Sequence, residues 1–222
     1  MSVLHLKLTP DSKPLSSFFG GLPHLADAAQ WPTCPATGEP QLHLLTLGPD
    51  FFFTPTIGEG YALSVFVSFD FAPDSPHLSI PRELAINLPE QAANAGNGYS
   101  RVLLHQPGAA PTPAPSAAYR ALPQCAIERP AFSAEEVKAE VATPGQGLDV
   151  SKFGGIPGWL QDDIFLGPKF GYLLQLSELD IRKVSPDHAG LFRDGLGYLF
   201  LNRNSRKLTP PAEAGHFFIQ FS

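Results

Sequence analysis

The chain has 222 residues, of which 43% are hydrophobic and 16% charged, and its formal net charge is −6. This hydrophobic fraction is sufficient for a folded core and excludes a charge-rich disordered chain. The 24 prolines and 20 glycines also exclude an architecture of long helices, because each interior proline costs a helix about 3 kcal/mol.

Short, aromatic-rich apolar runs bounded by turn residues are typical of β-strands. In chain order they occupy residues 44–47, 51–53, 61–71, 101–105, 172–176, 198–202 and 216–221. Apolar residues alternate in the last run, which predicts a strand with one face in the core. Short helical segments are expected at residues 81–84 and 133–141, the second opened by a capping box of Ser133 and Glu136. The pattern predicts a β-rich α+β fold.

Four features occur twice in the same order, which indicates two related halves. They are a Phe-Gly-Gly-apolar-Pro motif (19–23 and 153–157), a tryptophan (Trp31 and Trp159), an apolar run (44–47 and 173–176) and a strand opened by glycine (Gly60 and Gly197). We interpret residues 1–222 as a single unit made of a first half, 1–106, and a second half, 117–222. Residues 107–116, which are rich in proline, form a linker or loop between them.

The repeated motif is expected to form a tight turn. Paired glycines allow positive φ, and the proline that follows fixes its own φ and prevents a helix. A Gly-Gly pair binds phosphate where it opens a helix, but neither copy extends to GxGxxG or GxxxxGK[ST]. A structural turn is therefore the favoured interpretation, with ligand contact as the alternative.

Together with Trp31-Pro32 and residues 194–200, these motifs resemble those of the YwqG-like family, the DUF1963 domain of bacteria, from about Phe18 to Phe221. The family motif G-G-x-P-x-W-x-Q is matched by residues 154–161, whereas residues 86–130, rich in alanine and proline, depart from the family. The resemblance implies a bacterial, intracellular protein without an established activity. It also implies a toxin-neutralising role, because relatives are associated with polymorphic-toxin neighbourhoods.

No group of residues in the sequence points to a particular reaction. None of the seven histidines pairs with another at the HxH or HxxxH spacing of metal ligands, and no GxSxG nucleophile motif is present. Cys34 and Cys125 form no CxxC pair, so we expect free thiols in a reducing compartment. We assign no catalytic residue, no metal and no cofactor.

A possible ligand pocket follows the second motif. Trp159 and Gln161 provide an aromatic wall and an amide handle, or simply pack and satisfy a buried backbone group. Asp162 and Asp163 are suited to a divalent cation or to acid–base chemistry, with a solvated loop as the alternative. The basic run 203–207 lacks interleaved aromatic residues and is expected to form a polar hairpin turn rather than a nucleic-acid site.

Charge is distributed unevenly along the chain. No lysine or arginine lies between Lys13 and Arg82, and this stretch holds six acidic residues: Asp27, Glu39, Asp50, Glu59, Asp70 and Asp74. Such a surface repels nucleic acid and attracts basic partners. We predict that these six residues bind a basic protein, with a merely soluble acidic surface as the alternative.

Three functions remain open at this point. The first is a non-enzymatic cytoplasmic immunity protein that neutralises a basic toxin or effector domain by direct complex formation. The second is a small-molecule-binding or enzymatic domain with a cleft between the two halves, and the third is an interaction module that uses residues 107–116 as its handle. No hydrophobic run approaches the ~20 residues of a membrane helix, and residues 1–7 do not resemble a signal peptide. We therefore expect no membrane segment. We also expect a monomer or weak oligomer.

Overall fold

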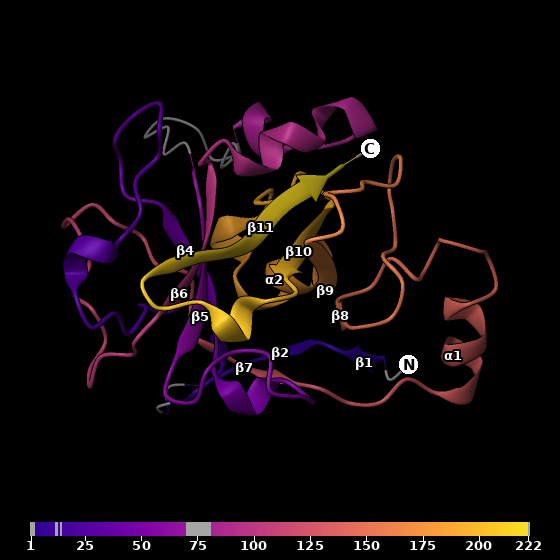
Figure 1. Cartoon of the computed structure of the whole chain (residues 1–222), viewed down its shortest axis with the longest axis horizontal. Helices are drawn as coiled ribbons and strands as arrows, with labels where there is room; N and C mark the ends of the chain where they lie inside the picture. The colour runs from indigo at the N-terminus through magenta and orange to yellow at the C-terminus, as the bar shows by residue number, and fades with distance from the viewer. Residues whose placement is uncertain (1–2, 12, 14, 70–80, 222) are drawn as a thin grey trace.

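The computed structural model describes residues 3–11, 13, 15–69 and 81–221. Its eleven strands form one antiparallel sheet in the order β1-β8-β9-β10-β11-β6-β5-β4-β3-β7-β2 (Figure 1). The strands are β1 (Leu4–His5), β2 (Lys7–Pro10), β3 (Phe18–Phe19), β4 (Leu42–Leu47), β5 (Ala62–Val67), β6 (Ser100–His105), β7 (Cys125–Glu128), β8 (Lys152–Phe153), β9 (Phe170–Ser177), β10 (Leu196–Asn202) and β11 (Ala212–Gln220). The α-helices are α1 (Ala134–Glu140) and α2 (Glu178–Val184), and the 3-10 helices are η1 (Ala28–Gln30), η2 (Pro49–Phe51), η3 (Arg82–Leu84), η4 (Pro89–Gly96), η5 (Pro186–His188) and η6 (Ser205–Lys207).

One N-terminal segment connects the two edges of the sheet. β1 and β2 are separated in the chain by Leu6 alone, yet they stand at opposite ends of the strand order, where β1 pairs with β8 and β2 pairs with β7. The sheet therefore curls until its edges meet on residues 4–10. Leu6 itself is buried in the core that the curled sheet encloses.

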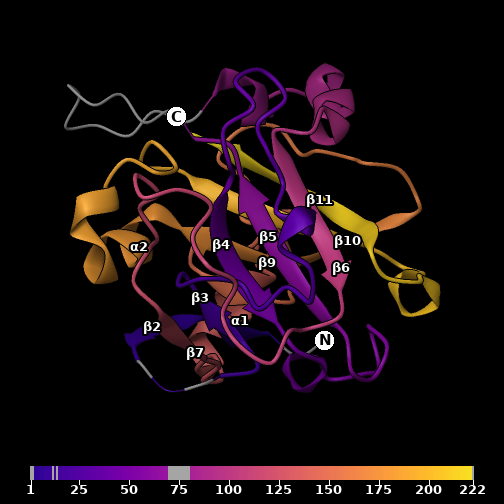
Figure 2. The ribbon, with the colours of Figure 1, turned by 90° about the vertical axis from the view of Figure 1, so that its left-hand side faces the viewer.

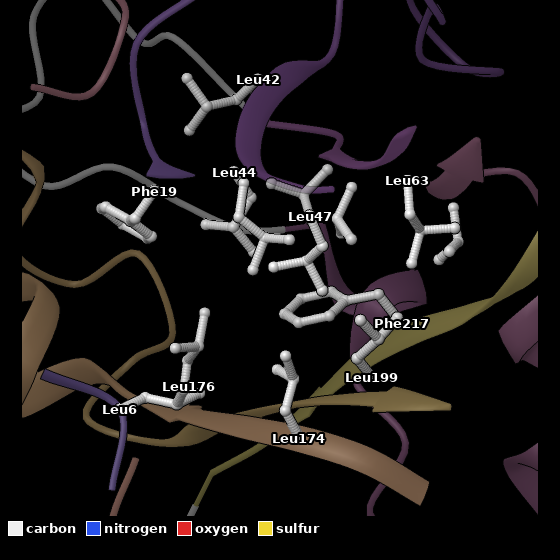
Figure 3. Close-up of a cluster of buried hydrophobic side chains, with 14 of the residues drawn as sticks. Leu6, Phe19, Leu42, Leu44, Leu47, Leu63, Leu174, Leu176, Leu199 and Phe217 are labelled. Atoms are coloured by element: carbon white, nitrogen blue, oxygen red, sulfur yellow. The ribbon is translucent and has the colours of Figure 1, made fainter. Parts of the chain in front are cut away.

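The main core is shared by strands from both parts of the chain. Leu44 and Leu47 from β4 face Phe217 from β11, while Leu174 from β9 and Leu199 from β10 complete the opposite wall (Figure 3). All of these side chains are essentially inaccessible to solvent. Burial of this apolar surface, which contributes about 25 cal/mol for each Å² removed from water, is the main force that keeps the two walls together.

Most of the predicted elements are confirmed, with two corrections. The strand expected over residues 61–71 is found as Ala62–Val67, and residues 70–71 lie outside the described residues. Residues 51–53 do not form a strand, because Gly48 and Pro49 turn the chain into η2, which buries Phe51 and leaves the Phe53 side chain 58% exposed. The last strand, β11, has both faces buried rather than one. Phe217 lies in the main core, and Phe218 packs on Tyr198 in a second cluster, which residues 159–166 help to cover.

The helical predictions are confirmed. Ser133 accepts a hydrogen bond from the Glu136 N–H, and the Glu136 carboxylate accepts one from the Ser133 N–H, so the capping box opens α1 as expected. Residues 82–84 form η3. Among the described residues, neither α1 nor any other helix has the length and apolar character needed to cross a bilayer.

The paired glycines adopt the left-handed backbone that the motif predicts. Gly20 and Gly21 have φ of 67° and 62°, and Gly154 and Gly155 have φ of 72° and 79°. A Cβ atom on Gly20 would also collide with the carbonyl oxygen of Pro123. Glycine is therefore required at these turns for conformation and, at Gly20, for space.

The two motifs occupy comparable places in the sheet. Counted from the strand at which each motif begins to the β6–β11 pair, one part of the sheet reads β3-β4-β5-β6 and the other reads β8-β9-β10-β11, with β7 and β2 beyond β3 and β1 beyond β8. The Gly20 N–H donates to the Leu44 carbonyl and the Gly154 N–H to the Leu173 carbonyl, both at 2.8 Å. The β6–β11 pair is thus the seam at which the two four-stranded parts meet.

Residues 107–116 lie against the first of these parts. They leave the end of β6, and the Gly108 and Thr112 N–H groups donate to the carbonyls of His24 and Pro23 at 2.8 Å. The Thr112 hydroxyl, which is buried, accepts a hydrogen bond from the Leu25 N–H at 2.8 Å. The proline-rich stretch is therefore a fixed surface segment of the structure.

Candidate functional site

The outer face of β4, β5 and β6 is covered by long connections rather than by helices. Figure 2 shows the segment with η1 passing in front of β5 and β6. Trp31, which follows η1, packs on Phe66 of β5 with ring centroids 5.9 Å apart, and on Tyr119 at 5.2 Å. These contacts place the connection between β3 and β4, which carries Asp27 and Glu39, over this face of the sheet.

Four of the six predicted acidic residues lie on the two connections that flank β4, and all four are exposed. Asp27 caps η1 by accepting a hydrogen bond from the Ala29 N–H, and Glu39 lies just before β4. Asp50, in η2, accepts from the Ser16 hydroxyl at 2.8 Å, and Glu59 lies just before β5. Asp70 and Asp74 lie outside the described residues.

None of these four carboxylates is neutralised by an ion pair with a described residue. The pairs found in that part of the chain are His5–Glu136, Arg101–Glu213, Lys152–Glu140, Arg182–Asp194 and Lys183–Asp180. The four carboxylates are therefore free to act on a charged partner, although they come from two connections and not from a single loop.

The predicted pocket residues lie along an extended segment over β10 and β11. Trp159 is half-buried against Tyr198, with ring centroids 5.0 Å apart. Gln161 is exposed and its amide donates to the Phe221 carbonyl at 3.2 Å, while the Asp162 carbonyl accepts from the Gln220 amide at 2.8 Å. Asp163 is exposed. The contacts of Trp159, Gln161 and Asp162 attach the segment to the sheet.

A groove of about 710 Å³ lies at the seam between β6 and β11. It is bounded by Trp31 and by the ion pair of Arg101 with Glu213, whose Nε and Oε2 atoms are 3.0 Å apart. The other oxygen of Glu213 accepts the Val102 N–H at 2.7 Å, next to a shift in the strand register. Partial burial raises the pKa of Glu213, against the opposing effects of that hydrogen bond and of Arg101.

Four buried polar side chains form a chain across β4, β5 and β6. His43 Nε2 lies 2.9 Å from the Thr46 hydroxyl, which lies 2.7 Å from the Ser64 hydroxyl, which in turn lies 2.8 Å from His105 Nε2. Burial lowers the pKa of His43 to about 4 and also lowers the pKa of His105, so both imidazoles are neutral at pH 7. Thr46 and His105, together with His24, line a cavity of about 160 Å³.

This chain of side chains has the elements of nucleophilic catalysis but not its arrangement. A serine hydroxyl on an imidazole is the pairing that activates a nucleophile. However, Ser64 is fully buried and is not among the residues that line the cavity, and His105 Nδ1 faces the Gln106 carbonyl instead of a carboxylate. The chain therefore satisfies buried polar groups and joins three strands. The sequence does not predict this chain of side chains, because His43 and His105 are far apart along it. The one feature of the sequence that indicates buried polar contacts is the presence of two hydroxyl residues, Thr46 and Ser64, within apolar strands.

Both cysteines are free, as the sequence predicts, and both are buried. Burial raises the pKa of Cys125. At Cys34, burial acts in the same direction, but hydrogen bonds from the Ser68 and Thr37 hydroxyls and from nearby backbone N–H groups outweigh it, so the pKa of this thiol is lowered. Cys34 also borders a cavity of about 320 Å³.

The comparisons with known proteins do not assign this site. Within residues 3–11, 13, 15–69 and 81–221, no three His, Cys, Asp or Glu side chains come together as metal ligands would. No family model matches the chain, and no curated protein matches it. The resemblance to the YwqG-like family therefore stays a prediction.

Proposed function

We propose that this protein is a non-enzymatic binding protein of the cytoplasm that neutralises a basic toxin or effector domain by direct complex formation, as an immunity protein does. The observation that carries the proposal is the exposure of Asp27, Glu39, Asp50 and Glu59 without ion pairs to described lysine or arginine side chains. Unpaired carboxylates attract a cationic protein over several ångströms and increase its rate of association.

The test mixes this protein with the purified product of the adjacent gene, which the proposal requires to be a basic protein. The variant D27N/E39Q/D50N/E59Q removes four charges, while asparagine at position 27 keeps the cap of η1. We expect the association rate at low salt to fall about ten-fold or more, with little change in dissociation. Surface plasmon resonance at several salt concentrations measures both rates.

The matched control variant E90Q/E135Q/D149N/D187N removes four charges from exposed carboxylates elsewhere. Its association rate is expected to stay within about two-fold of the wild-type rate, because screening weakens charges that lie far from the interface. Equal losses in the two variants, or no complex at micromolar concentration, would contradict the proposal.

A second candidate function, a small-molecule-binding or enzymatic domain, is favoured by the groove between β6 and β11. Its volume of about 710 Å³ lies within the range of ligand pockets, and Arg101 and Glu213 provide a donor and an acceptor side by side. A metabolite that raises the melting temperature of the wild type is expected to lose this effect in R101Q/E213Q. Thermal-shift measurements across a metabolite panel test it; a panel in which nothing shifts the wild type contradicts this candidate.

We also infer that residues 1–106 and 117–222 are related by duplication. This inference is supported by the parallel strand orders β3-β4-β5-β6 and β8-β9-β10-β11, and by the equivalent hydrogen bonds of Gly20 and Gly154. Trp31 packs on β5 and Trp159 on β10, which hold the same place in the two orders. The two four-stranded parts should superimpose with both glycine pairs in register; parts that superimpose only out of register would contradict the inference.

A further inference from the structure

The basic turn between β10 and β11 forms one wall of a cavity of about 350 Å³. The turn contributes residues 202–207, including η6, and the opposite wall consists of Thr54, Pro55 and Thr56 from the connection between β4 and β5. Leu173 and Leu201 also line the cavity. Segments from three distant parts of the chain therefore meet around it.

The turn is held in place by hydrogen bonds that do not use its charged groups. The Ser205 hydroxyl, which is buried, donates to the Thr56 carbonyl at 2.7 Å and thereby links the two walls. Within the turn, the Asn204 N–H donates to the Asn202 side chain at 2.9 Å, and the Lys207 N–H donates to the Asn204 carbonyl at 2.8 Å. The frame of the cavity is therefore built before any ligand arrives.

The rim of the cavity carries three cations. Arg203, Arg206 and Lys207 are exposed, and the ion pairs among the described residues involve other basic side chains. The net charge of the chain is −6, so this concentration of positive charge is local and does not reflect a basic protein. A cationic rim above an apolar floor suits a ligand with an anionic group and an apolar body.

We propose that this cavity binds a small organic phosphate, with the phosphate on Arg203, Arg206 and Lys207 and the organic part on Leu173, Leu201 and Pro55. Three cations match a dianion better than a single carboxylate, and arginine is the preferred donor to phosphate oxygens. A volume of about 350 Å³ exceeds what inorganic phosphate fills and lies in the lower range of ligand pockets. A nucleic acid is disfavoured because no aromatic side chain lines the cavity for bases to stack on.

Isothermal titration calorimetry with phenyl phosphate as the probe tests the proposal. Phenyl phosphate is expected to bind about ten-fold more tightly than inorganic phosphate, because only the former covers the apolar floor. The variant R203Q/R206Q/K207Q is expected to weaken binding about 30-fold or more, since each charge-assisted hydrogen bond is worth about ten-fold. The control R120Q/K138Q/K183Q, which removes three exposed cations elsewhere, is expected to bind as the wild type does.

Two results would overturn the proposal. One is a wild type that binds phenyl phosphate no better than the triple variant or no better than inorganic phosphate; the other is a single-stranded oligonucleotide that binds more tightly than phenyl phosphate through the same three residues. If the triple variant unfolds, R206Q/K207Q, which changes only η6, replaces it. The variant D27N/E39Q/D50N/E59Q should keep its affinity for phenyl phosphate, so the acidic surface and the cavity are tested separately.

Discussion

Replacing Lys152 by methionine is expected to lower the free energy of unfolding by about 3 to 5 kcal/mol. Lys152 is fully buried, and its Nζ atom lies 2.8 Å and 2.7 Å from the two carboxylate oxygens of Glu140, which is also buried. The same carboxylate accepts the N–H groups of Leu148 and Ile156, each at 2.8 Å. Methionine fills the space of the lysine but leaves the Glu140 charge buried without a cation.

Urea unfolding, followed by tryptophan fluorescence, measures this effect. The double variant E140Q/K152M should recover part of the loss, because no buried charge is then left unpaired. The Leu148 and Ile156 N–H groups use different oxygens of Glu140, and the single amide oxygen of glutamine can accept only one of them. Lys183, whose side chain is 73% exposed and paired with Asp180, supplies the control: K183M should change stability by less than about 0.5 kcal/mol. A loss below about 1 kcal/mol in K152M would contradict the prediction.

Acidification from pH 7 to pH 4 is expected to destabilise the protein by about 3 kcal/mol through His43 alone. Burial holds the pKa of His43 at about 4 in the folded state, below its ordinary value of 6.5. Between these two values the unfolded chain binds more protons than the folded one, so stability rises with pH. The contribution is fully present above pH 6.5 and is lost as the pH falls toward 4.

The difference between wild type and H43N isolates this contribution, because four other histidines also have lowered pKa values: His24, His105, His188 and His216. Asparagine keeps a donor for the Gly20 carbonyl, which lies 3.0 Å from His43 Nδ1, but does not titrate. Urea midpoints at pH 7 and pH 4 should therefore separate less in H43N than in the wild type. Identical separations would place the acid sensitivity elsewhere in the molecule.

Features that depend on neighbouring residues could be predicted from the sequence. A few adjacent residues determine each of three such features: the left-handed glycines of both motifs, the capping box of Ser133, and the hairpin turn at residues 203–207. The predicted strands are also confirmed where turn residues such as glycine and proline bound them. Residues 51–53 were assigned wrongly, because three adjacent phenylalanines match a strand pattern while Gly48-Pro49 bends the backbone into η2.

Features that depend on distant residues could not be predicted. Glu140 and Lys152 appear in the sequence as ordinary surface charges, and only the fold buries them together. The groove at Arg101 and Glu213 needs the pairing of β6 with β11, which no local pattern specifies. The charge pattern of the sequence predicts which acidic residues lack nearby lysine and arginine. It does not predict that the four described ones lie on two separate connections.

The strand that joins both edges of the sheet imposes an order on assembly. Residues 4–10 are synthesised before their partners in β7 and β8, which end at Glu128 and Phe153. Until those partners are synthesised, this strand has unpaired N–H and C=O groups, which are open to pairing with other nascent chains. A circular permutant that places residues 3–11 after β11 would remove this wait, and its soluble yield on translation, compared with that of the unpermuted chain, would report how much the wait limits the protein.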